Sequence, residues 1–400
     1  MLKINIDSQK IQELLTRGVV EIINKADLQK KLNSGKKLRV KLGIDPTSPN
    51  LHLGRAIPLL KLRDFQDLGH QIVFIVGDFT GVIGDTSDKD SERPMMSPVL
   101  IKENMKNYAK QAGKIIDLKK CEIRYNSEWL KKLTYDKIGE QADQFSVAEF
   151  IARENISKRL KAGTRVSLRE VLYPLMQGYD SVAVKADVEV GGTDQRFNLL
   201  AGRELQKYFK QDQQNIIIGP LLEGTDGRKM SSSWGNTVNL TDQPNNMFGK
   251  IMSIPDNLII KYFILATRLP MEEISKTEKE LKTGANPRDI KAKLAKEIVK
   301  FYHGDKVAQQ AEEAFNKQFK NKEIPNDIPQ VNIECRLWNI VDLLAATKLV
   351  SSKSEARRLI EQGGVKVDNQ RLAIKDLKNL IKVKSGMIIQ VGKRKFIKIR

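Results

Sequence analysis

Two short segments carry residue types that nucleotide chemistry requires. The first, GIDPTSPNLHLGR at residues 43–55, places His52 and Gly54 where a strand-like run gives way to a helix-like run. The second, GRKMSSSWGN at residues 227–236, places Lys229 among glycines and serines. A histidine at the start of a helix and a lysine on a polar loop can both act on phosphate charge. Together the two segments predict a site for a nucleoside triphosphate.

The residues around the first segment predict a strand–helix–strand unit. Residues 38–42 alternate apolar and basic side chains, residues 57–68 repeat apolar side chains at near-helical spacing, and residues 71–76 form an apolar run. The N–H groups and the dipole at the start of this helix favour a phosphate by about 0.3–1 kcal/mol. Gly54 leaves room there for a base or ribose. The predicted fold is α/β, with a doubly wound, Rossmann-like sheet.

Each segment also has a plainer interpretation when it is taken alone. His52 can simply cap a helix, Gly54 can ease packing, and a Lys-Met-Ser run is common. The occurrence of both segments in this order, with strand patterns between them, favours the nucleotide site. At this point the chain resembles the class I aminoacyl-tRNA synthetases, whose His-Ile-Gly-His and Lys-Met-Ser-Lys-Ser signatures match residues 52–55 and 229–233.

Further segments indicate which amino acid is activated. The segments that closely resemble the tyrosine pocket of tyrosyl-tRNA synthetases are residues 78–85, 173–183 and 190–198. Tyr173, Gln177 and Asp180 are spaced by four and three residues, so a helix places them on one face. An ionised Asp180 can accept a hydrogen bond from a phenolic hydroxyl, which phenylalanine lacks. The plainer alternative is an ordinary polar helix face.

The resemblance implies a role for each matching residue. Asp180 reads the phenol, Tyr173, Gln177 and Asp85 hold the ammonium group, and Asp194 holds the ribose of ATP. The expected tyrosine contacts are Lys41, Thr80, Asp85, Tyr173, Gln177, Asp180 and Gln195. The expected ATP contacts are Gly43, Asp45, His52, Gly54, Gly192, Asp194 and Lys229. The expected catalytic residues are His52, Arg55, Thr47, Lys229 and Ser232, which stabilise charge on the phosphates.

Three positions depart from the family pattern. Lys41 stands where the better-known bacterial branch has a second phenol-reading tyrosine, Arg55 replaces the second signature histidine, and Ser232 replaces the second signature lysine. A guanidinium can still bind a ribose or phosphate oxygen. Ser232 removes one positive charge from the loop, which Arg228 could restore. We expect catalysis to be retained, at a lower rate than in relatives.

Composition restricts the class of protein. Four hundred residues are enough for two or three domains with their own cores. The two cysteines, Cys121 and Cys335, suggest neither a disulfide framework nor a zinc site, and neither His70 nor His303 suggests a metal site. Because no apolar run reaches the length of a signal peptide core or a membrane span, a cytosolic location is expected.

Charge points to a polyanionic partner. The chain has a net charge of +20, and residues 336–400 contain 16 Lys and Arg against 5 Asp and Glu. This basic region resembles the small RNA-binding module named after ribosomal protein S4, which reads RNA shape and backbone. Lys353, Arg357 and Arg358 lie on one side of a predicted helix there. The expected partner is tRNA.

The predicted domains follow from these segments. Residues 1–228 form the Rossmann-like catalytic domain, with a helical insertion at about 100–168. Residues 229–323 contain the lysine loop and an α-helical domain on the anticodon side, which could equally be a spacer. A proline-marked linker covers 324–335, and residues 336–400 form the small α+β S4-like domain. Family members dimerise through the insertion, which predicts a homodimer, although no sequence feature demonstrates an interface.

The resemblance implies the reaction. Tyrosine and ATP with Mg²⁺ give tyrosyl-adenylate and pyrophosphate, and the tyrosyl group then moves to the 3′ end of tRNA(Tyr), with no tightly bound cofactor. Three alternatives remain open from the sequence. They are a nucleotidyltransferase acting on a small molecule, a non-enzymatic RNA-binding protein in which Arg55 and Ser232 mark lost activity, and a tryptophanyl relative, which should lack Asp180.

Overall fold

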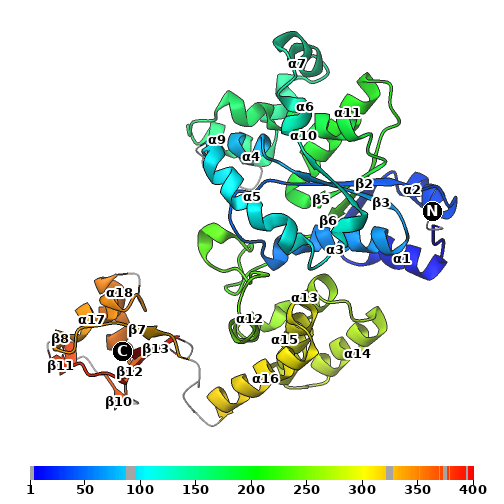
Figure 1. Cartoon of the computed structure of the whole chain (residues 1–400). Coiled ribbons are helices and arrows are strands. Elements are labelled where there is room, and N and C mark those ends of the chain that lie inside the picture. The colour runs from blue at the N-terminus through cyan, green and yellow to red at the C-terminus, as the bar shows by residue number, and fades with distance from the viewer. Residues whose placement is uncertain are drawn as a thin grey trace. The chain divides into compact units, whose positions relative to one another are not determined.

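A six-stranded sheet lies at the centre of the N-terminal part of the chain (Figure 1). Its strand order is β1-β6-β5-β2-β3-β4, with β1 antiparallel to β6 and the other neighbours parallel. The strands are β1 (Glu21–Ile23), β2 (Arg39–Ile44), β3 (Gln71–Val76), β4 (Cys121–Tyr125), β5 (Val188–Gly192) and β6 (Asn215–Gly219). The chain winds outward from β2 in one direction and from β5 in the other. The carboxyl ends of these two strands therefore border the crevice where such sheets bind ligands.

The computed structural model describes residues 4–86, 95–320, 328–350, 352–368, 370–372, 376–377, 379–392 and 395–400. The chain divides into two units, Met1–Ala311 and Glu312–Arg400. In the described part of the chain, no helix combines the length and the apolar character that crossing a membrane requires.

Helices cover both faces of the large sheet. Helix α3 (Leu53–Asp67) packs on one face, and α10 (Leu168–Val184) and α11 (Arg196–Tyr208) pack on the other (Figure 1). The apolar run of β3 is buried between these layers, as expected for a parallel strand. Helix α10 begins with a capping box between Ser167 and Glu170 and ends at Lys185 in the left-handed conformation. Helix α1 (Ser8–Thr16) precedes strand β1, and helix α2 (Lys25–Asn33) follows it.

The predicted helical insertion contains one strand of the sheet. Helix α4 (Thr80–Ile83) precedes this region, and the helices within it are α5 (Pro98–Ala112), α6 (Ser127–Leu130), α7 (Tyr135–Ala142), α8 (Val147–Ile151) and α9 (Glu154–Lys161). Strand β4 nevertheless pairs in parallel with β3. The sequence does not indicate this strand, because CEIRY is short and only half buried and has no apolar run, and the insertion at about 100–168 stays a prediction.

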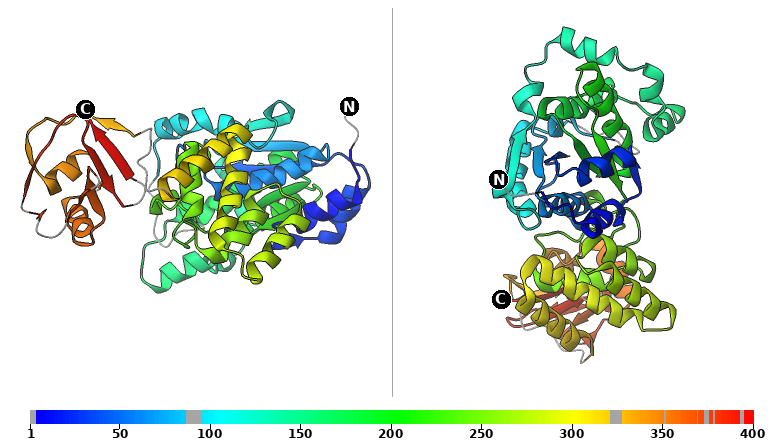
Figure 2. Two further views of the ribbon diagram at one scale, coloured as in Figure 1. Left: turned by 90° about the horizontal axis from the view of Figure 1, so that it is seen from below. Right: turned by 90° about the vertical axis from the view of Figure 1, so that its right-hand side faces the viewer.

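A group of helices follows the sheet within the first unit. Its members are α12 (Pro244–Met252), α13 (Ile259–Ala266), α14 (Met271–Lys282) and α15 (Pro287–His303), and α16 (Asp305–Lys320) continues into the second unit. Helix α15 packs against α12, α13 and α14, and α13 also packs against α3 (Figures 1 and 2). The lysine loop includes a single turn of 3-10 helix, η3 (Ser232–Trp234).

The C-terminal unit has its own sheets and core, coloured orange to red in Figure 2. A five-stranded sheet has the order β10-β9-β12-β13-β7, and a two-stranded sheet pairs β11 with β8. The elements are β7 (Gln330–Val331), β8 (Leu337–Asn339), α17 (Ile340–Ala346), α18 (Lys353–Glu361), β9 (Val365–Val367), β10 (Gln370–Arg371), β11 (Leu380–Lys382), β12 (Ile388–Val391) and β13 (Lys395–Ile399). Strand β7 lies inside the predicted linker 324–335, whose residues 324–327 fall outside the described residues. Because β7 pairs with β13, the folded unit begins before residue 336.

Candidate active site

A cavity of about 310 Å³ opens at the carboxyl ends of β2 and β5. Residues from both signature segments and from the α10 face meet there. The predicted site residues that line it are Gly43, Asp45, Thr47, His52, Gly54, Arg55, Thr80, Asp85, Tyr173, Gln177, Asp180, Gly192, Asp194, Gln195, Lys229 and Ser232. Segments separated by up to about half of the chain therefore share one cavity, as the parallel topology requires.

The signature turn is fixed against the segment that follows the lysine loop. His52 occupies the N-cap position of α3, without a capping hydrogen bond from its side chain, and pairs with Asn239 in an isolated antiparallel bridge. Gly54 is needed for close approach, because a Cβ at this position would lie 3.1 Å from Nδ1 of His52. The backbone N–H of Gly54 also lies 3.4 Å from Sδ of Met230. The two signatures are thus in direct contact.

Arg55 orders the turn that precedes the helix. Its Nη2 donates to Oγ1 of Thr47 at 2.9 Å. Its Nη1 donates to the hydroxyl of Tyr108 at 2.8 Å and to the carbonyl of Asp45 at 3.2 Å. The guanidinium therefore lies beside Thr47 in the wall of the cavity. Tyr108, on α5, has no signal in the sequence that connects it with this site.

Lys229 forms an ion pair across the cavity. Its Nζ lies 2.9 Å from Oδ2 of Asp194, with both side chains partly exposed. Arg228, by contrast, forms an ion pair of 2.6 Å with Asp226, and its guanidinium stacks on the ring of Trp234 at 4.7 Å. Ser232 is exposed at the start of η3. The loop therefore presents Lys229 toward Asp194, the residue predicted to hold the ribose, and holds Arg228 within the loop.

Asp180, the residue predicted to read the phenol, is buried and lines the cavity. Its Oδ1 accepts a hydrogen bond from the indole Nε1 of Trp129 at 2.8 Å, and its Oδ2 lies 3.4 Å from Nδ2 of Asn126. Burial raises the pKa of Asp180 to about 7, while the nearby Lys41 ammonium and these two donors oppose the rise. Trp129 and Asn126 were missed from the sequence, since they lie in the region predicted as insertion and match no motif.

A second carboxylate, that of the half-buried Asp45, also lines the cavity. Its Oδ1 accepts from Oγ1 of Thr80 at 2.7 Å, and its Oδ2 accepts from the hydroxyl of Tyr173 at 2.8 Å. Burial raises the pKa of Asp45 to about 6 and raises that of the Tyr173 phenol well above its ordinary value. Tyr173, predicted to contact tyrosine, therefore contacts Asp45, which is predicted to contact ATP.

The other predicted ammonium contacts form a connected amide network. Gln195 donates from Nε2 to Oδ2 of Asp85 at 2.7 Å. Asn198 donates from Nδ2 to Oε1 of Gln177 at 3.0 Å and to Oε1 of Gln195 at 3.1 Å. Asp85 and Gln177 thus belong to one network of side chains that line the cavity, with Asn198 as the link. Asn198 is the last residue of the pocket-like segment 190–198, but it was not predicted as a site residue.

Lys41 does not line the cavity, although it was predicted to contact tyrosine. Its side chain is 0% exposed, and its Nζ lies 2.8 Å from Oε1 of Glu189. It also donates to Oγ of Ser181 at 2.8 Å and to the carbonyl of Gln177 at 3.0 Å. The expected direct contact is corrected to an indirect one, because a buried ammonium requires a carboxylate and Glu189, on β5, supplies it. Glu189 itself lines the cavity.

The predicted RNA contacts lie in the C-terminal unit. Lys353, Arg357 and Arg358 are exposed on α18, and Lys353 forms an ion pair with Asp342 on α17 at 2.7 Å. Across the residues that the structure describes, no group of three or more His, Cys, Asp or Glu side chains could hold a metal ion.

Comparison with known families decides the identity of the fold and the reaction. Residues 32–320 match the family described as tRNA synthetases class I (W and Y), and residues 320–399 match the Tyrosine--tRNA ligase SYY-like C-terminal domain. The chain belongs to the class I tRNA synthetases. The predicted α/β fold with a parallel sheet and an appended C-terminal domain is thereby confirmed.

Full-length relatives narrow the family to one activity. The chain is 48% identical to the tyrosine–tRNA ligase of Thermotoga maritima over 97% of this chain and 96% of the relative. It is 47% identical to that of Carboxydothermus hydrogenoformans over 98% of each. The predicted function is confirmed: the synthetase activates L-tyrosine with ATP and transfers it to tRNA(Tyr). The tryptophanyl, nucleotidyltransferase and non-enzymatic alternatives are set aside.

Solved structures show the same fold at lower identity. The C-terminally truncated mitochondrial tyrosyl-tRNA synthetase of Aspergillus nidulans superposes with a TM-score of 0.65 at 21% identity, over 78% of this chain and 94% of that one. The tyrosyl-tRNA synthetase of Archaeoglobus fulgidus complexed with L-tyrosine gives 0.61 at 22% identity, over 77% and 100%. The arrangement of the sheet and helices is therefore shared across distant members.

Proposed function

We propose that the cavity binds tyrosine at its Asp180 end and ATP at its Lys229 end. The observation that carries this assignment is the buried carboxylate of Asp180, which is held by the Trp129 indole and faces the cavity. A phenol hydroxyl is a donor that can satisfy the remaining acceptor capacity of Asp180, and phenylalanine would leave it unsatisfied. Selectivity for tyrosine follows from this polar end of the cavity.

The charged groups of the amino acid would lie between the two ends. Tyr173, Gln177 and Asp85 line the middle of the cavity and supply one hydroxyl, one amide and one carboxylate toward the ammonium group. Thr80 and Gln195 complete this side as hydrogen-bonding partners of Asp45 and Asp85. Held in this way, the tyrosine carboxylate points toward the nucleotide, which is the positioning that in-line attack requires.

The ATP end supplies groups for the nucleotide. Gly43 and Gly192 leave the backbone open to the base and ribose, and Asp194 accepts from the ribose hydroxyls. His52 and Thr47 lie with Arg55 at the phosphate end, where the N-terminus of α3 favours anions. When the ribose engages Asp194, the ammonium of Lys229 is released from its ion pair of 2.9 Å and can turn to the phosphates.

In the reaction, the tyrosine carboxylate forms a bond to the α-phosphorus while the bond to the bridging oxygen of pyrophosphate breaks. Negative charge grows on the leaving pyrophosphate, where Lys229, His52 and Arg55 would stabilise it. Magnesium would enter the site bound to ATP, because phosphate oxygens are its usual ligands. Ser232 supplies at most a hydroxyl where relatives have a second cation. The 3′ hydroxyl of the tRNA then attacks the carbonyl carbon, and AMP leaves.

We further propose that the C-terminal unit binds tRNA and that the chain forms a homodimer. Exposed Lys353, Arg357 and Arg358 support the first proposal, because basic side chains on one helix suit an RNA backbone. Exposed apolar side chains near the predicted insertion support the second: Val99, Tyr135, Val147, Ile151, Leu160 and Leu168. The predicted domain boundaries and cytoplasmic location remain predictions. The assignment of the chain to a branch of the family that has lysine at position 41 also remains a prediction.

Tyrosine-dependent exchange of labelled pyrophosphate into ATP tests the proposed site. Wild-type protein is compared with Asp180→Asn and Lys229→Ala, beside controls with tryptophan and without amino acid. We expect Asp180→Asn to act mainly on tyrosine and Lys229→Ala mainly on the exchange rate. Equal losses for tyrosine and ATP in Asp180→Asn would argue that Asp180 is structural. Sedimentation equilibrium of the wild type and of Val147→Asp tests the dimer.

A further inference from the structure

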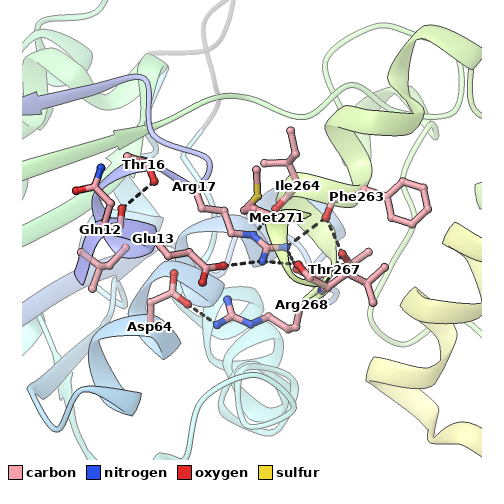
Figure 3. Close-up of polar contacts among 12 residues, drawn as sticks. Gln12, Glu13, Thr16, Arg17, Asp64, Phe263, Ile264, Thr267, Arg268 and Met271 are labelled. Carbon is pink, nitrogen blue, oxygen red and sulfur yellow. Dashed lines mark hydrogen bonds and ion pairs between the residues drawn. The ribbon is translucent and has the colours of Figure 1, made fainter. Parts of the chain in front are cut away.

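A buried arginine joins the N-terminal segment to α13 (Figure 3). Arg17 follows α1, and its side chain is 6% exposed. Its Nη1 lies 3.0 Å from Oε1 of Glu13. Its other N–H groups donate to carbonyl oxygens at the end of α13 and just beyond it, which are Phe263 at 3.4 Å, Ile264 at 2.9 Å, Thr267 at 2.6 Å and Leu269 at 2.8 Å. All five N–H donors of the guanidinium are therefore used.

These bonds cap the C-terminus of α13. The last carbonyls of a helix lack partners within the helix, and Thr267, which ends α13, has an extended backbone with φ −121° and ψ 172°. Arg17 satisfies these carbonyls and places a positive charge at the negative end of the helix dipole. One side chain thus fixes the end of α13 to the N-terminal segment.

Other residues of α13 hold the strand-like segment before the lysine loop. The Nζ of Lys261 forms an ion pair with Oε2 of Glu223 at 2.7 Å. The hydroxyl of Tyr262, the next residue, donates to the carbonyl oxygen of Glu223 at 2.6 Å. Both the side chain and the backbone of Glu223 are therefore held by α13.

Glu223 is the backbone partner of the proposed catalytic lysine. Glu223 and Lys229 face each other in an isolated antiparallel bridge. Beside it, the N–H of Gly224 donates to the carbonyl of Arg228 at 2.7 Å. Any shift of Glu223 along α13 would accordingly be passed to the backbone of Lys229.

The helix that begins at the histidine signature contacts the same junction. On α3, Asp64 forms an ion pair of 2.5 Å with Arg268, which follows α13 (Figure 3). Lys61, also on α3, donates at 2.8 Å to the carbonyl of Arg17 and at 2.8 Å to that of Leu14. The junction around Arg17 therefore touches the helix of one signature and, through α13, supports the loop of the other.

We propose that Arg17 is a positioning residue for Lys229. By fixing α13, Arg17 sets where Glu223 holds the lysine loop relative to the His52 end of α3. The inference rests on the proposed role of Lys229 at the leaving pyrophosphate. The buried side chain of Arg17 also forms part of the cavity wall, and its proposed effect on Lys229 passes through the contiguous contacts of α13.

The first test is single-turnover formation of tyrosyl-adenylate. Arg17→Met should slow this step by about 2- to 30-fold, the range of coupling through such contacts, with the tyrosine dissociation constant changed by less than about twofold. Arg17→Lys keeps the charge but not the five-donor fork, so it should restore part of the rate. Arg63→Met is the matched control, because Arg63 on α3 also bonds a carbonyl, that of Ile115 at 3.0 Å, and an aspartate, away from this junction.

The second test is a double-mutant cycle with Lys229→Ala. If Arg17 acts through Lys229, Arg17→Met should have little further effect once Lys229 is removed. An equal slowing in both backgrounds would overturn the inference while leaving the role of Lys229 intact. A wild-type rate in Lys229→Ala would instead remove that role, and with it the inference, so the two failures are distinguishable.

A third variant covers the outcome in which Arg17→Met does not fold. Tyr262→Phe deletes one hydroxyl at the other end of the same connection and should slow adenylate formation with tyrosine binding retained. Its effect should likewise vanish in the Lys229→Ala background. A folded Tyr262→Phe and a folded Arg17→Lys that both retain the full rate would overturn the proposal, and thermal melting establishes which variants are folded.

Discussion

The indole Nε1 of Trp129 donates a hydrogen bond of 2.8 Å to Oδ1 of Asp180 at the tyrosine end of the cavity. Trp129 lies in α6 and Asp180 in α10, so the contact joins two elements that the sequence separates by an insertion of helices. The bond holds Asp180 in one orientation while its carboxylate faces the cavity. In the proposed tyrosine site, this fixed geometry would favour recognition of the phenol, because a mobile carboxylate would lose entropy on binding.

We expect Asp180→Asn to weaken tyrosine use far more than ATP use. Loss of a hydrogen bond to a charged acceptor is worth about 1.5–3 kcal/mol, which corresponds to about 10- to 150-fold in affinity. Equilibrium binding of tyrosine and the ATP dependence of pyrophosphate exchange measure the two effects. Trp129→Phe, which removes the donor together with part of the ring, should give a smaller loss with the same selectivity.

The free energy of unfolding, measured without tyrosine or ATP, should depend on pH through Asp180. Burial raises the pKa of Asp180 to about 7, above its unfolded value near 4. The folded protein therefore keeps a proton that the unfolded chain releases, and this group reduces stability as pH rises through that window. Asp180→Asn should raise the free energy of unfolding at pH 8 by about 4 kcal/mol, since each pKa unit corresponds to about 1.36 kcal/mol, and should leave it nearly unchanged at pH 4. Urea titrations at the two pH values measure the difference in the free energy of unfolding between Asp180→Asn and the wild type. An equal difference at pH 8 and pH 4 would contradict the prediction.

The buried pair of Lys41 and Glu189 should matter more for stability than its surface counterparts. Lys41→Met leaves Glu189 charged and buried, so we expect a loss of about 3–5 kcal/mol in the free energy of unfolding. The double variant with Glu189→Gln should lose less than the sum of the single variants. Lys282→Met, which breaks an exposed ion pair with Glu278, is the control and should unfold like the wild type. Additive losses at Lys41 and Glu189 would show that the two do not interact.

The loop prediction concerns Lys229 and Ser232. Lys229→Ala should lower the rate constant of adenylate formation with little change in tyrosine affinity, because its contact with pyrophosphate forms as charge develops. Ser232→Ala should change little, and Ser232→Lys should speed the step, since one well-oriented transition-state contact is commonly worth about 2.7–4 kcal/mol. The structure holds Arg228 on Asp226 and Trp234, so it does not already occupy that role. Single-turnover measurements on the three variants decide between these outcomes.

Removal of the C-terminal unit should separate the two half-reactions. A chain ending at residue 320 should form tyrosyl-adenylate at nearly the wild-type rate and should charge tRNA poorly. The cut precedes β7 because β7 pairs with β13, so a cut at residue 336 would leave an unpaired remnant of the sheet. In the intact protein, tRNA binding should weaken steeply with salt as counterions are released. A truncated chain that charges tRNA at the full rate would exclude this unit as the RNA anchor.

The sequence by itself determined the fold class and the reaction. Alternating and apolar runs at residues 38–42 and 71–76 predicted parallel strands, and β2 and β3 lie there. The signatures at His52 and Lys229 predicted one nucleotide site, and both residues line one cavity. These features are readable because they depend on local periodicity and on short motifs. Strand β4 was not predicted, because its five residues are mostly half buried and show neither a clear periodicity nor a motif.

Only the tertiary structure decided which side chains meet. Lys41 was expected to face tyrosine, yet it lies behind the cavity wall, because burial of its ammonium required the carboxylate of Glu189 on a neighbouring strand. Trp129 meets Asp180 and Arg17 meets α13 across 51 and about 250 residues of sequence. No local pattern encodes such contacts, since they arise when the sheet and its helices bring distant segments together. The residue types and motifs were therefore enough to predict the reaction, while the orientation of each side chain was set by the residues that pack against it.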